Sequence, residues 1–253
     1  MLFSMGEPFS SMLKHLTEFD VTYVEVVDES EHSLNASRVN HLKRVARENG
    51  LEFTVHAPFV DINIASPNPE LRRVMLRRLE KSMRYARQLR SRQWVFHSGW
   101  KSGISEFYPN LDWQINLRSV RTLVTLARKL GVDISLENTP EPFSFLVKRM
   151  QDFALLYSEL GSQFDIDMTL DVAHANTNGQ IFGFLEKFGR KISHMHISDN
   201  EGKYDSHKGL GYGKINWEEV AAALKKIKYK GTIVLESVDH VEESLQKMRE
   251  LFT

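Results

Sequence analysis

The stretch DISLENTP, residues 133–140, decides the fold that this sequence predicts. Successive side chains of a strand point to opposite faces, so Ile134 and Leu136 share one face and Ser135 and Glu137 share the other. The aliphatic face can pack against helices. The polar face ends in a carboxylate at the C-terminal tip of the strand. In a (β/α)8 barrel such a face points to the barrel axis, and active sites lie at the C-terminal ends of the strands.

The same ending recurs along the chain. Six predicted strands in a row carry a histidine or a carboxylate at or near the C-terminal end. His174 follows the fourth of these strands, and Asp205 and His207 follow the fifth in a polar loop. Imidazole and carboxylate groups are the usual ligands of a divalent transition metal such as zinc or manganese. The complete set of nine candidate ligands is His56, His97, Glu137, Asp171, His174, His196, Asp205, His207 and Glu236.

Short apolar strands alternate with amphipathic helices from end to end, which predicts one (β/α)8 TIM barrel over residues 1–253. The predicted strands are Leu2–Ser4, Val21–Val27, Leu51–His56, Gln93–His97, Asp133–Glu137, Asp167–Val172, Ile192–Ile197 and Thr232–Glu236. The predicted helices are Phe9–Phe19, Ala36–Asn49, Pro69–Leu89, Trp113–Leu130, Phe143–Leu160, Ile181–Phe188, Trp217–Ile227 and Val241–Leu251.

Composition narrows the function classes. The chain has 33 basic and 33 acidic residues, whereas duplex DNA-binding proteins usually carry a basic footprint. It has no cysteine, so a bound metal must be held by nitrogen and oxygen. No apolar run approaches the length of about 18 residues that spans a membrane, and the first residues lack a signal-peptide pattern. We therefore expect a cytoplasmic protein with no membrane partner.

The segment Ser198–Ile215 is long, polar and rich in glycine. Loops of this length in compact domains are usually functional or disordered. A flexible surface loop is one interpretation of the segment. The other is that Asp205 and His207, two residues apart, fold over the barrel mouth and join His174 as ligands. The presence of His174 nearby favours the second interpretation.

Each candidate ligand also has an ordinary structural interpretation. Buried histidines are often hydrogen-bonded core residues, and strand-end carboxylates often cap the next helix. Burying Glu137, Asp171 and Glu236 together, however, is strongly unfavourable without a compensating cation. The set therefore predicts a divalent metal site with one to three ions. His194 lies one layer deeper than His196 and is predicted to support it. The remaining histidines are predicted to lie at the surface: His15, His32, His41 and His240.

Five motifs make the chain resemble the xylose isomerase-like TIM barrels, a family that includes sugar and sugar phosphate isomerases and epimerases and also endonuclease IV, an AP endonuclease. The resemblance runs from His56 to Glu236. The motifs are HAPFVDINIAS (56–66), LENTP (136–140), LDVAHAN (170–176), HISDNEG (196–202) and DSHKGLGYGKI (205–215).

The resemblance implies three groups of ligands. The residues matching a central metal site are Glu137, Asp171, His196 and Glu236. Those matching a neighbouring site that shares Glu137 are His56 and His97. Those matching a third site, found in the trinuclear members, are His174, Asp205 and His207.

The complete ligand set is typical of endonuclease IV, in which three zinc ions cleave the phosphodiester at an abasic site. Phe59 and Val60 also follow His56 at the spacing of the DNA-inserting residues of that enzyme. Two nuclease features are absent: the opening Gly-x-His-x-Ser pattern, and the Gly-Gln-Gly after Glu-Asn-Thr, where this chain has Pro140-Glu141-Pro142. These departures and the neutral charge favour the isomerase and epimerase branch.

The expected function is thus metal-dependent isomerisation or epimerisation of a small sugar or sugar phosphate. In similar epimerases the glutamates matching Glu137 and Glu236 transfer the proton next to a carbonyl, and His174 is a candidate to stabilise developing charge. The alternatives are an abasic-site endonuclease, the only case with a nucleic-acid partner, and a barrel that binds metal or sugar without turnover. The lysines and arginine available for a substrate phosphate are Lys101, Lys208, Lys214 and Arg118.

Overall fold

Seven parallel strands form one sheet in the computed structural model, which describes residues 2–252. Their neighbours in the sheet follow the order of the chain, and the sheet curls into a nearly closed TIM barrel. The strands are β1 (Tyr23–Val27), β2 (Glu52–His56), β3 (Trp94–His97), β4 (Ile134–Glu137), β5 (Asp167–Asp171), β6 (Ile192–Ile197) and β7 (Thr232–Leu235).

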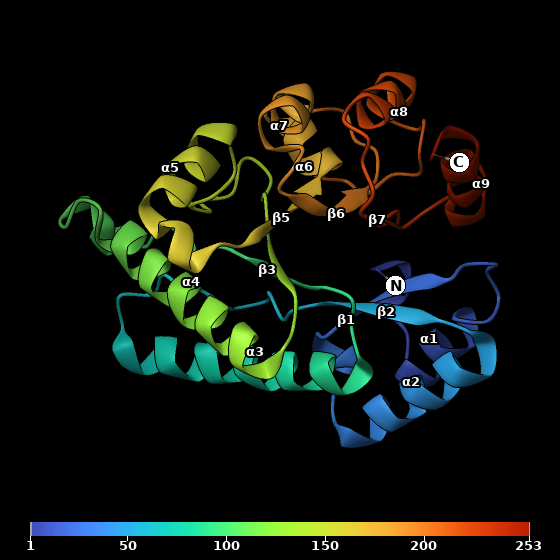
Figure 1. Ribbon diagram of the computed structural model, residues 1–253, viewed down its shortest axis with the longest axis horizontal. Coiled ribbons are helices and arrows are strands. Elements are labelled where there is room, and N and C mark those ends of the chain that lie inside the picture. The colour runs from blue at the N-terminus through green and yellow to red at the C-terminus, as the bar shows by residue number, and fades with distance from the viewer. Residues whose placement is uncertain (1, 253) are drawn as a thin grey trace.

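Helices connect successive strands and lie around the outside of the sheet (Figure 1). The α-helices are α1 (Phe9–His15), α2 (Ala36–Asn49), α3 (Pro69–Leu89), α4 (Leu111–Leu130), α5 (Met150–Leu160), α6 (Val172–Thr177), α7 (Ile181–Phe188), α8 (Trp217–Lys226) and α9 (Val241–Phe252). Four short 3-10 helices accompany them: η1 (Leu2–Ser4), η2 (Ser30–His32), η3 (Gly103–Glu106) and η4 (Ser162–Phe164).

The start of α3 shows how the sequence defines these elements. The side-chain oxygen of Asn68 accepts hydrogen bonds from the backbone N–H groups of Glu70 and Leu71, and Pro69 occupies the first helical position. This oxygen satisfies two donors that have no partner within the helix, and proline has no N–H to leave unpaired there. The helix consequently begins where the sequence predicts.

The predicted first strand is wrong. Leu2–Ser4 is a 3-10 helix whose backbone bonds are local, from Met5 N to Leu2 O and from Glu7 N to Ser4 O. The described residues therefore hold seven strands rather than eight. Strands β1 and β7 contact each other at the seam but form no ladder.

The predicted helix Phe143–Leu160 begins seven residues late, at Met150. The preceding segment instead lies along the chain that follows β3, with hydrogen bonds from Leu146 N to Gly99 O and from Lys101 N to Ser144 O. These backbone pairs replace the first two turns of the predicted helix. They place Phe143 and Phe145 at the barrel mouth.

Two layers of polar side chains fill the barrel interior. In the deeper layer Ser135 Oγ lies 2.6 Å from Thr169 Oγ1, and Thr54 Oγ1 donates to Glu25 Oε2 at 2.9 Å. The layer nearer the C-terminal ends holds the predicted ligands. Strand register places His97 beside Glu137 and Asp171 beside His196. TIM barrels are filled by such layers, so the strand periodicity alone brings the ligands to one height.

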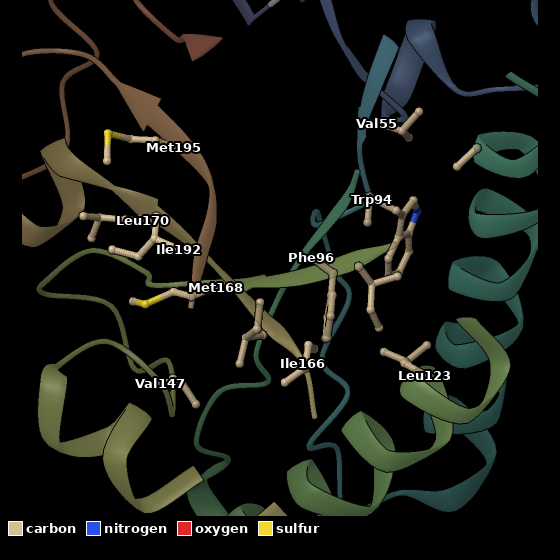
Figure 2. Close-up of a cluster of buried hydrophobic side chains, with 14 of the residues drawn as sticks. Val55, Trp94, Phe96, Leu123, Val147, Ile166, Met168, Leu170, Ile192 and Met195 are labelled. Carbon is tan, nitrogen blue, oxygen red and sulfur yellow. The ribbon is translucent and has the colours of Figure 1, made fainter. Parts of the chain in front are cut away.

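The apolar faces of the strands pack against the helices. Figure 2 shows part of this core, where Trp94 and Phe96 of β3 lie near Leu123 of α4 and where Met168 and Leu170 of β5 lie near Ile192 and Met195 of β6. All seven side chains are buried, and the Trp94 and Phe96 rings stack with centroids 5.3 Å apart. This core fixes the strands that carry the site.

His32 is buried, not at the surface, because its Nε2 lies 2.8 Å from the carbonyl oxygen of Glu7. Within residues 2–252, no helix combines the length and the apolar character that crossing a membrane requires.

Candidate metal centre

All nine predicted ligands lie at the C-terminal mouth of the barrel. His56, His97, Glu137 and Asp171 are the last residues of β2, β3, β4 and β5. The other five come from β6, from the first turn of α6, from the residue after β7 and from the loop between β6 and α8: His196, His174, Glu236, Asp205 and His207.

The central group contains Glu137, Asp171, His196 and Glu236. Nδ1 of His196 lies 3.4 Å from Oε1 of Glu137 and 3.3 Å from Oε1 of Glu236. One ligand atom each from Asp171, His196 and Glu236 lie within 4.8 Å of one another. All four side chains are buried. The two glutamates therefore approach the same imidazole nitrogen.

A second group shares Glu137. Its Oε2 lies 3.3 Å from Nε2 of His56 and 3.1 Å from Nε2 of His97. The carboxylate of Glu137 thus directs one oxygen to each group. Such a shared carboxylate is what two neighbouring metal positions require.

A third group forms at the loop. Oδ2 of Asp205 lies 3.2 Å from Nε2 of His174 and 2.6 Å from Nε2 of His207. The loop therefore folds over the barrel mouth and does not extend into solvent. His174 connects this group to the central one, because its Nδ1 lies 3.2 Å from Oε1 of Glu137.

Asp199 holds this loop in place. Its buried carboxylate accepts hydrogen bonds from the N–H groups of Gly211 and Ile215, from Nε1 of Trp217 and from its neighbour Asn200. The loop backbone at Asp199 also pairs with Lys208 in both directions. These bonds fix the ends of the segment that carries Asp205 and His207.

His207 has a left-handed backbone, with φ of 46°. Non-glycine residues rarely adopt such angles unless the surroundings impose them, and they concentrate at functional sites. Its carbonyl oxygen accepts from Val238 N, just after β7. The fold thus holds His207 in an unfavourable conformation that points its ring at Asp205.

The histidines are oriented by hydrogen-bond acceptors on their far sides. Nδ1 of His56 lies 2.8 Å from the carbonyl oxygen of Ala57, and Nδ1 of His174 lies 2.7 Å from that of Asn138. A carbonyl oxygen can only accept, so both Nδ1 atoms carry the proton. Each Nε2 lone pair is then directed at the carboxylates. This arrangement is typical of metal-binding histidines.

Burial and neighbouring charges shift the pKa values of the carboxylates. Burial raises the pKa of Asp171 to about 7, helped by the charges of Asp205 and Glu137 and opposed by that of His174. For Glu137, burial also acts to raise the pKa, but the charges of His196 and His97 outweigh it and hold the pKa well below the usual range. The same site therefore holds both an ionised carboxylate and one that resists ionisation.

The imidazoles respond to these carboxylates. Burial alone would lower the pKa of His174, but the charges of Asp171 and Asp205 raise it well above the usual value. The pKa of His196 is likewise raised against burial, chiefly by Glu236 and Glu25. Protons thus occupy positions at which a cation would balance the same negative charge.

The donor set fits a divalent metal ion. It consists of imidazole nitrogen and carboxylate oxygen, which zinc and manganese both accept. Among the described residues, neither Nδ1 of His196 nor Oδ2 of Asp171 makes a hydrogen bond, although both atoms are buried. Buried polar atoms without hydrogen bonds are rare in proteins, so these two are suited to bind an ion.

A cavity of about 330 Å³ opens over the three groups. Phe59 and Phe145 form part of its wall, and their ring centroids lie 5.8 Å from that of His97. No lysine or arginine among residues 2–252 lines it. Its full lining is Leu2, Val27, His56, Phe59, His97, Glu137, Pro140, Phe143, Phe145, His174, Asp205, His207 and Glu236.

Sequence reasoning missed Glu25. This residue lies in the middle of β1, is buried, and contacts both histidines of β6: Nε2 of His194 at 3.0 Å and Nε2 of His196 at 2.9 Å. Its lone charge in the apolar stretch YVEVV, on the inward face of a strand, is the signal that could have found it. The deeper position predicted for His194 is confirmed, since His194 contacts Glu25 below the ligands.

The chain belongs to a known family. A family model described as the xylose isomerase-like TIM barrel matches residues 13–252, which is nearly the whole chain. The resemblance recognised in the motifs is therefore confirmed, as is the barrel fold.

Individual relatives agree with this assignment. An uncharacterised protein of Methanocaldococcus jannaschii is 31% identical over 92% of this chain and 80% of its own. A D-psicose 3-epimerase of Ruminiclostridium cellulolyticum is 27% identical over 79% of this chain and 68% of its own. The crystal structure of a D-tagatose 3-epimerase-like protein superposes with a TM-score of 0.92 at 28% identity, covering 98% of this chain and 94% of that one. Characterised relatives thus include sugar epimerases.

Proposed function

We propose that this xylose isomerase-like barrel is a metal-dependent epimerase that inverts the carbon next to the carbonyl of a small unphosphorylated sugar. One relative is named a D-psicose 3-epimerase, and another is described as a D-tagatose 3-epimerase-like protein. Both of these sugars are ketoses. The central group supplies the ligands for a divalent metal ion, zinc or manganese. The second and third groups offer positions for further ions.

The observation that carries the proposal is the placement of Glu137 and Glu236. Both carboxylates approach Nδ1 of His196, and both line the cavity. They come from β4 and from the end of β7, which lie three strands apart in the sheet. A sugar bound over His196 would therefore have one carboxylate toward each face.

Epimerisation needs this arrangement. One glutamate removes the proton from the carbon beside the carbonyl, and the other returns a proton to the opposite face, so the configuration inverts without net change in charge. Glu137 is ionised because its pKa lies well below the usual range, so its carboxylate has a free position for the proton. A bound divalent metal ion would supply a Lewis acid that polarises the carbonyl. When the third group holds no ion, the raised pKa of His174 favours a proton on Nε2, and this buried imidazole at the cavity can donate a hydrogen bond to developing negative charge.

The cavity supports an unphosphorylated substrate. Its walls offer aromatic rings and aliphatic carbons, and its volume is at the lower end for small-molecule sites. The cations considered for a phosphate lie elsewhere: Lys208 and Lys214 pair with Glu201, Arg118 is exposed on α4, and Lys101 lies outside the cavity lining. A phosphate in this cavity would face carboxylates without a compensating side chain.

One observation favours the nuclease alternative. The three groups of possible ligands match what a trinuclear centre would need. The cavity and Phe59 argue against it. The Phe59 ring packs against His56 with centroids 5.3 Å apart, and Glu29 binds the N–H groups of Phe59 and Val60. Phe59 therefore closes the cavity and does not project as a wedge for DNA.

The test is a pair of assays on one preparation. The protein is stripped with a chelator, reloaded with Mn²⁺ or Zn²⁺, and incubated with a panel of ketoses and, separately, with a duplex that contains one abasic site. We expect metal-restored conversion of at least one ketose to its epimer. Metal-restored nicking of the duplex with no sugar converted would establish the nuclease alternative and refute the proposal.

A further inference from the structure

Glu25 lies below the metal centre and joins two histidines and a threonine. Its Oε1 lies 2.9 Å from Nε2 of His196, and its Oε2 lies 3.0 Å from Nε2 of His194 and accepts from Thr54 Oγ1 at 2.9 Å. Its side chain is buried, as are all three partners. It does not line the cavity, so it cannot touch a substrate there.

This contact determines which nitrogen of His196 faces the metal centre. Nε2 of His196 and Oε1 of Glu25 form an ion-pair contact at 2.9 Å. An ionised carboxylate oxygen and an imidazole nitrogen that both presented lone pairs would repel each other at this distance, so Nε2 of His196 carries a proton. In a neutral imidazole the other nitrogen, Nδ1, then has the free lone pair. Nδ1 is the atom that faces Glu137 and Glu236.

We propose that Glu25 is a positioning residue that fixes the proton of His196 on Nε2 and thereby presents Nδ1 as a metal ligand. The inference rests on the metal centre of the proposed function but not on the sugar. A carboxylate behind a metal-bound histidine typically changes metal affinity by about 10- to 100-fold. The two residues come from strands that are far apart in the sequence, since Glu25 lies on β1 and His196 lies on β6.

Glu25, His194 and His196 have the composition of a metal site of their own. The contacts of Glu25 favour the positioning role. Both oxygens of Glu25 face an imidazole nitrogen, and Oε2 also receives the Thr54 hydroxyl. An ion at this place would have to displace the Thr54 or His194 proton from the carboxylate.

The first experiment compares Mn²⁺ affinity, measured from the EPR signal of free Mn²⁺, in the wild-type protein and in Glu25→Gln. The amide has the same shape but cannot accept from both histidines, so we expect the affinity to fall by about 10- to 100-fold. The matched control is Ser135→Ala, which removes a buried hydrogen bond to Thr169 in the same layer without touching His196. It should bind Mn²⁺ within about threefold of the wild type.

The second experiment needs no variant at Glu25. Histidine labelled with ¹⁵N in the Zn²⁺-loaded wild-type protein should show His196 bound through Nδ1, with a downfield, slowly exchanging proton on Nε2. The signal is assigned by its loss in His196→Gln. Coordination through Nε2, or Mn²⁺ affinity of folded Glu25→Gln equal to that of the wild type, would overturn the proposal.

These readouts separate the two claims. Weaker metal binding in Glu25→Gln together with no sugar turnover in the wild type would support the role of Glu25 and refute the sugar substrate. Sugar turnover with unchanged metal binding in Glu25→Gln would do the reverse.

Discussion

Nδ1 of His196 lies 3.3 Å from Oε1 of Glu236, although His196 lies on β6 and Glu236 follows the last residue of β7. The parallel register of the two strands, in which His196 pairs with Val234, brings them together. A glutamate in this place can touch a metal ion and a reacting carbon of a bound sugar.

The metal-free protein should lose stability as the pH rises from 6 to 9. The pKa values of His174 and His196 are raised, and that of Asp171 is raised to about 7. The folded protein therefore keeps protons at pH values at which the unfolded chain has already released them. Glu137, whose pKa is lowered, already stabilises the folded state fully at pH 6, so its effect on stability does not change between pH 6 and 9. We expect a fall of at least about 1 kcal/mol, or roughly 2–4 °C in Tm, by calorimetry.

Metal should reverse this loss. At about a hundredfold excess over Kd, Mn²⁺ or Zn²⁺ should stabilise the folded state by about 2.7 kcal/mol, which is roughly 5–10 °C for a chain of this size. Binding should also release protons, measurable by calorimetry in buffers of different ionisation enthalpy. A Tm of the metal-free protein that is constant from pH 6 to 9 and unchanged by either metal would contradict the metal centre.

The loop group should hold one ion that can be removed separately. His207→Ala deletes one side chain of the third group and leaves the central group intact. Elemental analysis of the zinc-loaded protein should show one fewer zinc per chain than in the wild type, with the tightest site unchanged. His41→Ala, on the exposed side of α2, is the control and should leave the zinc content as it is.

Asp199 should be needed for the loop rather than for the barrel. Asp199→Ala removes the acceptor of the N–H donors of Gly211, Ile215 and Trp217, of which the last two residues are buried. This loss should cost about 2–5 kcal/mol in urea unfolding. Hydrogen exchange should rise across residues 199–215. The exposed Asp165→Ala serves as the control, and equal exchange in the two variants would show that Asp199 does not anchor the loop.

Much of this site follows from strand periodicity. The alternation in residues 133–137 predicted that Glu137 faces the axis, and the same reasoning placed His56, His196 and Glu236 correctly, because residues at equal depth on parallel strands must meet. The fold of the loop was predicted from the spacing of Asp205 and His207 together with the nearby His174, and the structure agrees.

Contacts between distant segments could not be predicted in this way. Glu25 contacts His194 across 169 residues of sequence, and although the lone charge in YVEVV marks Glu25, no local pattern identifies its partner. The helix predicted from Phe143 failed because backbone pairing with the segment after β3 outweighs its helical pattern. Leu2–Ser4 has the composition of a strand but forms its hydrogen bonds within its own turn.

The preference for a neutral sugar can be measured directly. If the cavity lacks a cation for phosphate, a ketose should be converted with kcat/KM at least about tenfold above that of its terminal phosphate ester, a difference of about 1.4 kcal/mol. Inorganic phosphate at millimolar concentration should not inhibit. Preferential turnover of the phosphate ester would show that the substrate class is wrong.

The central claim, proton transfer by paired glutamates, is tested most directly by isotope exchange in the metal-loaded enzyme. In D₂O, the wild type should place deuterium on the carbon next to the carbonyl of the epimerised sugar. Glu236→Gln should retain its metal and lose this exchange by at least about 10³-fold, while Glu201→Gln, outside the cavity lining, exchanges like the wild type. Epimerisation without deuterium incorporation, or full exchange in metal-loaded Glu236→Gln, would contradict the account.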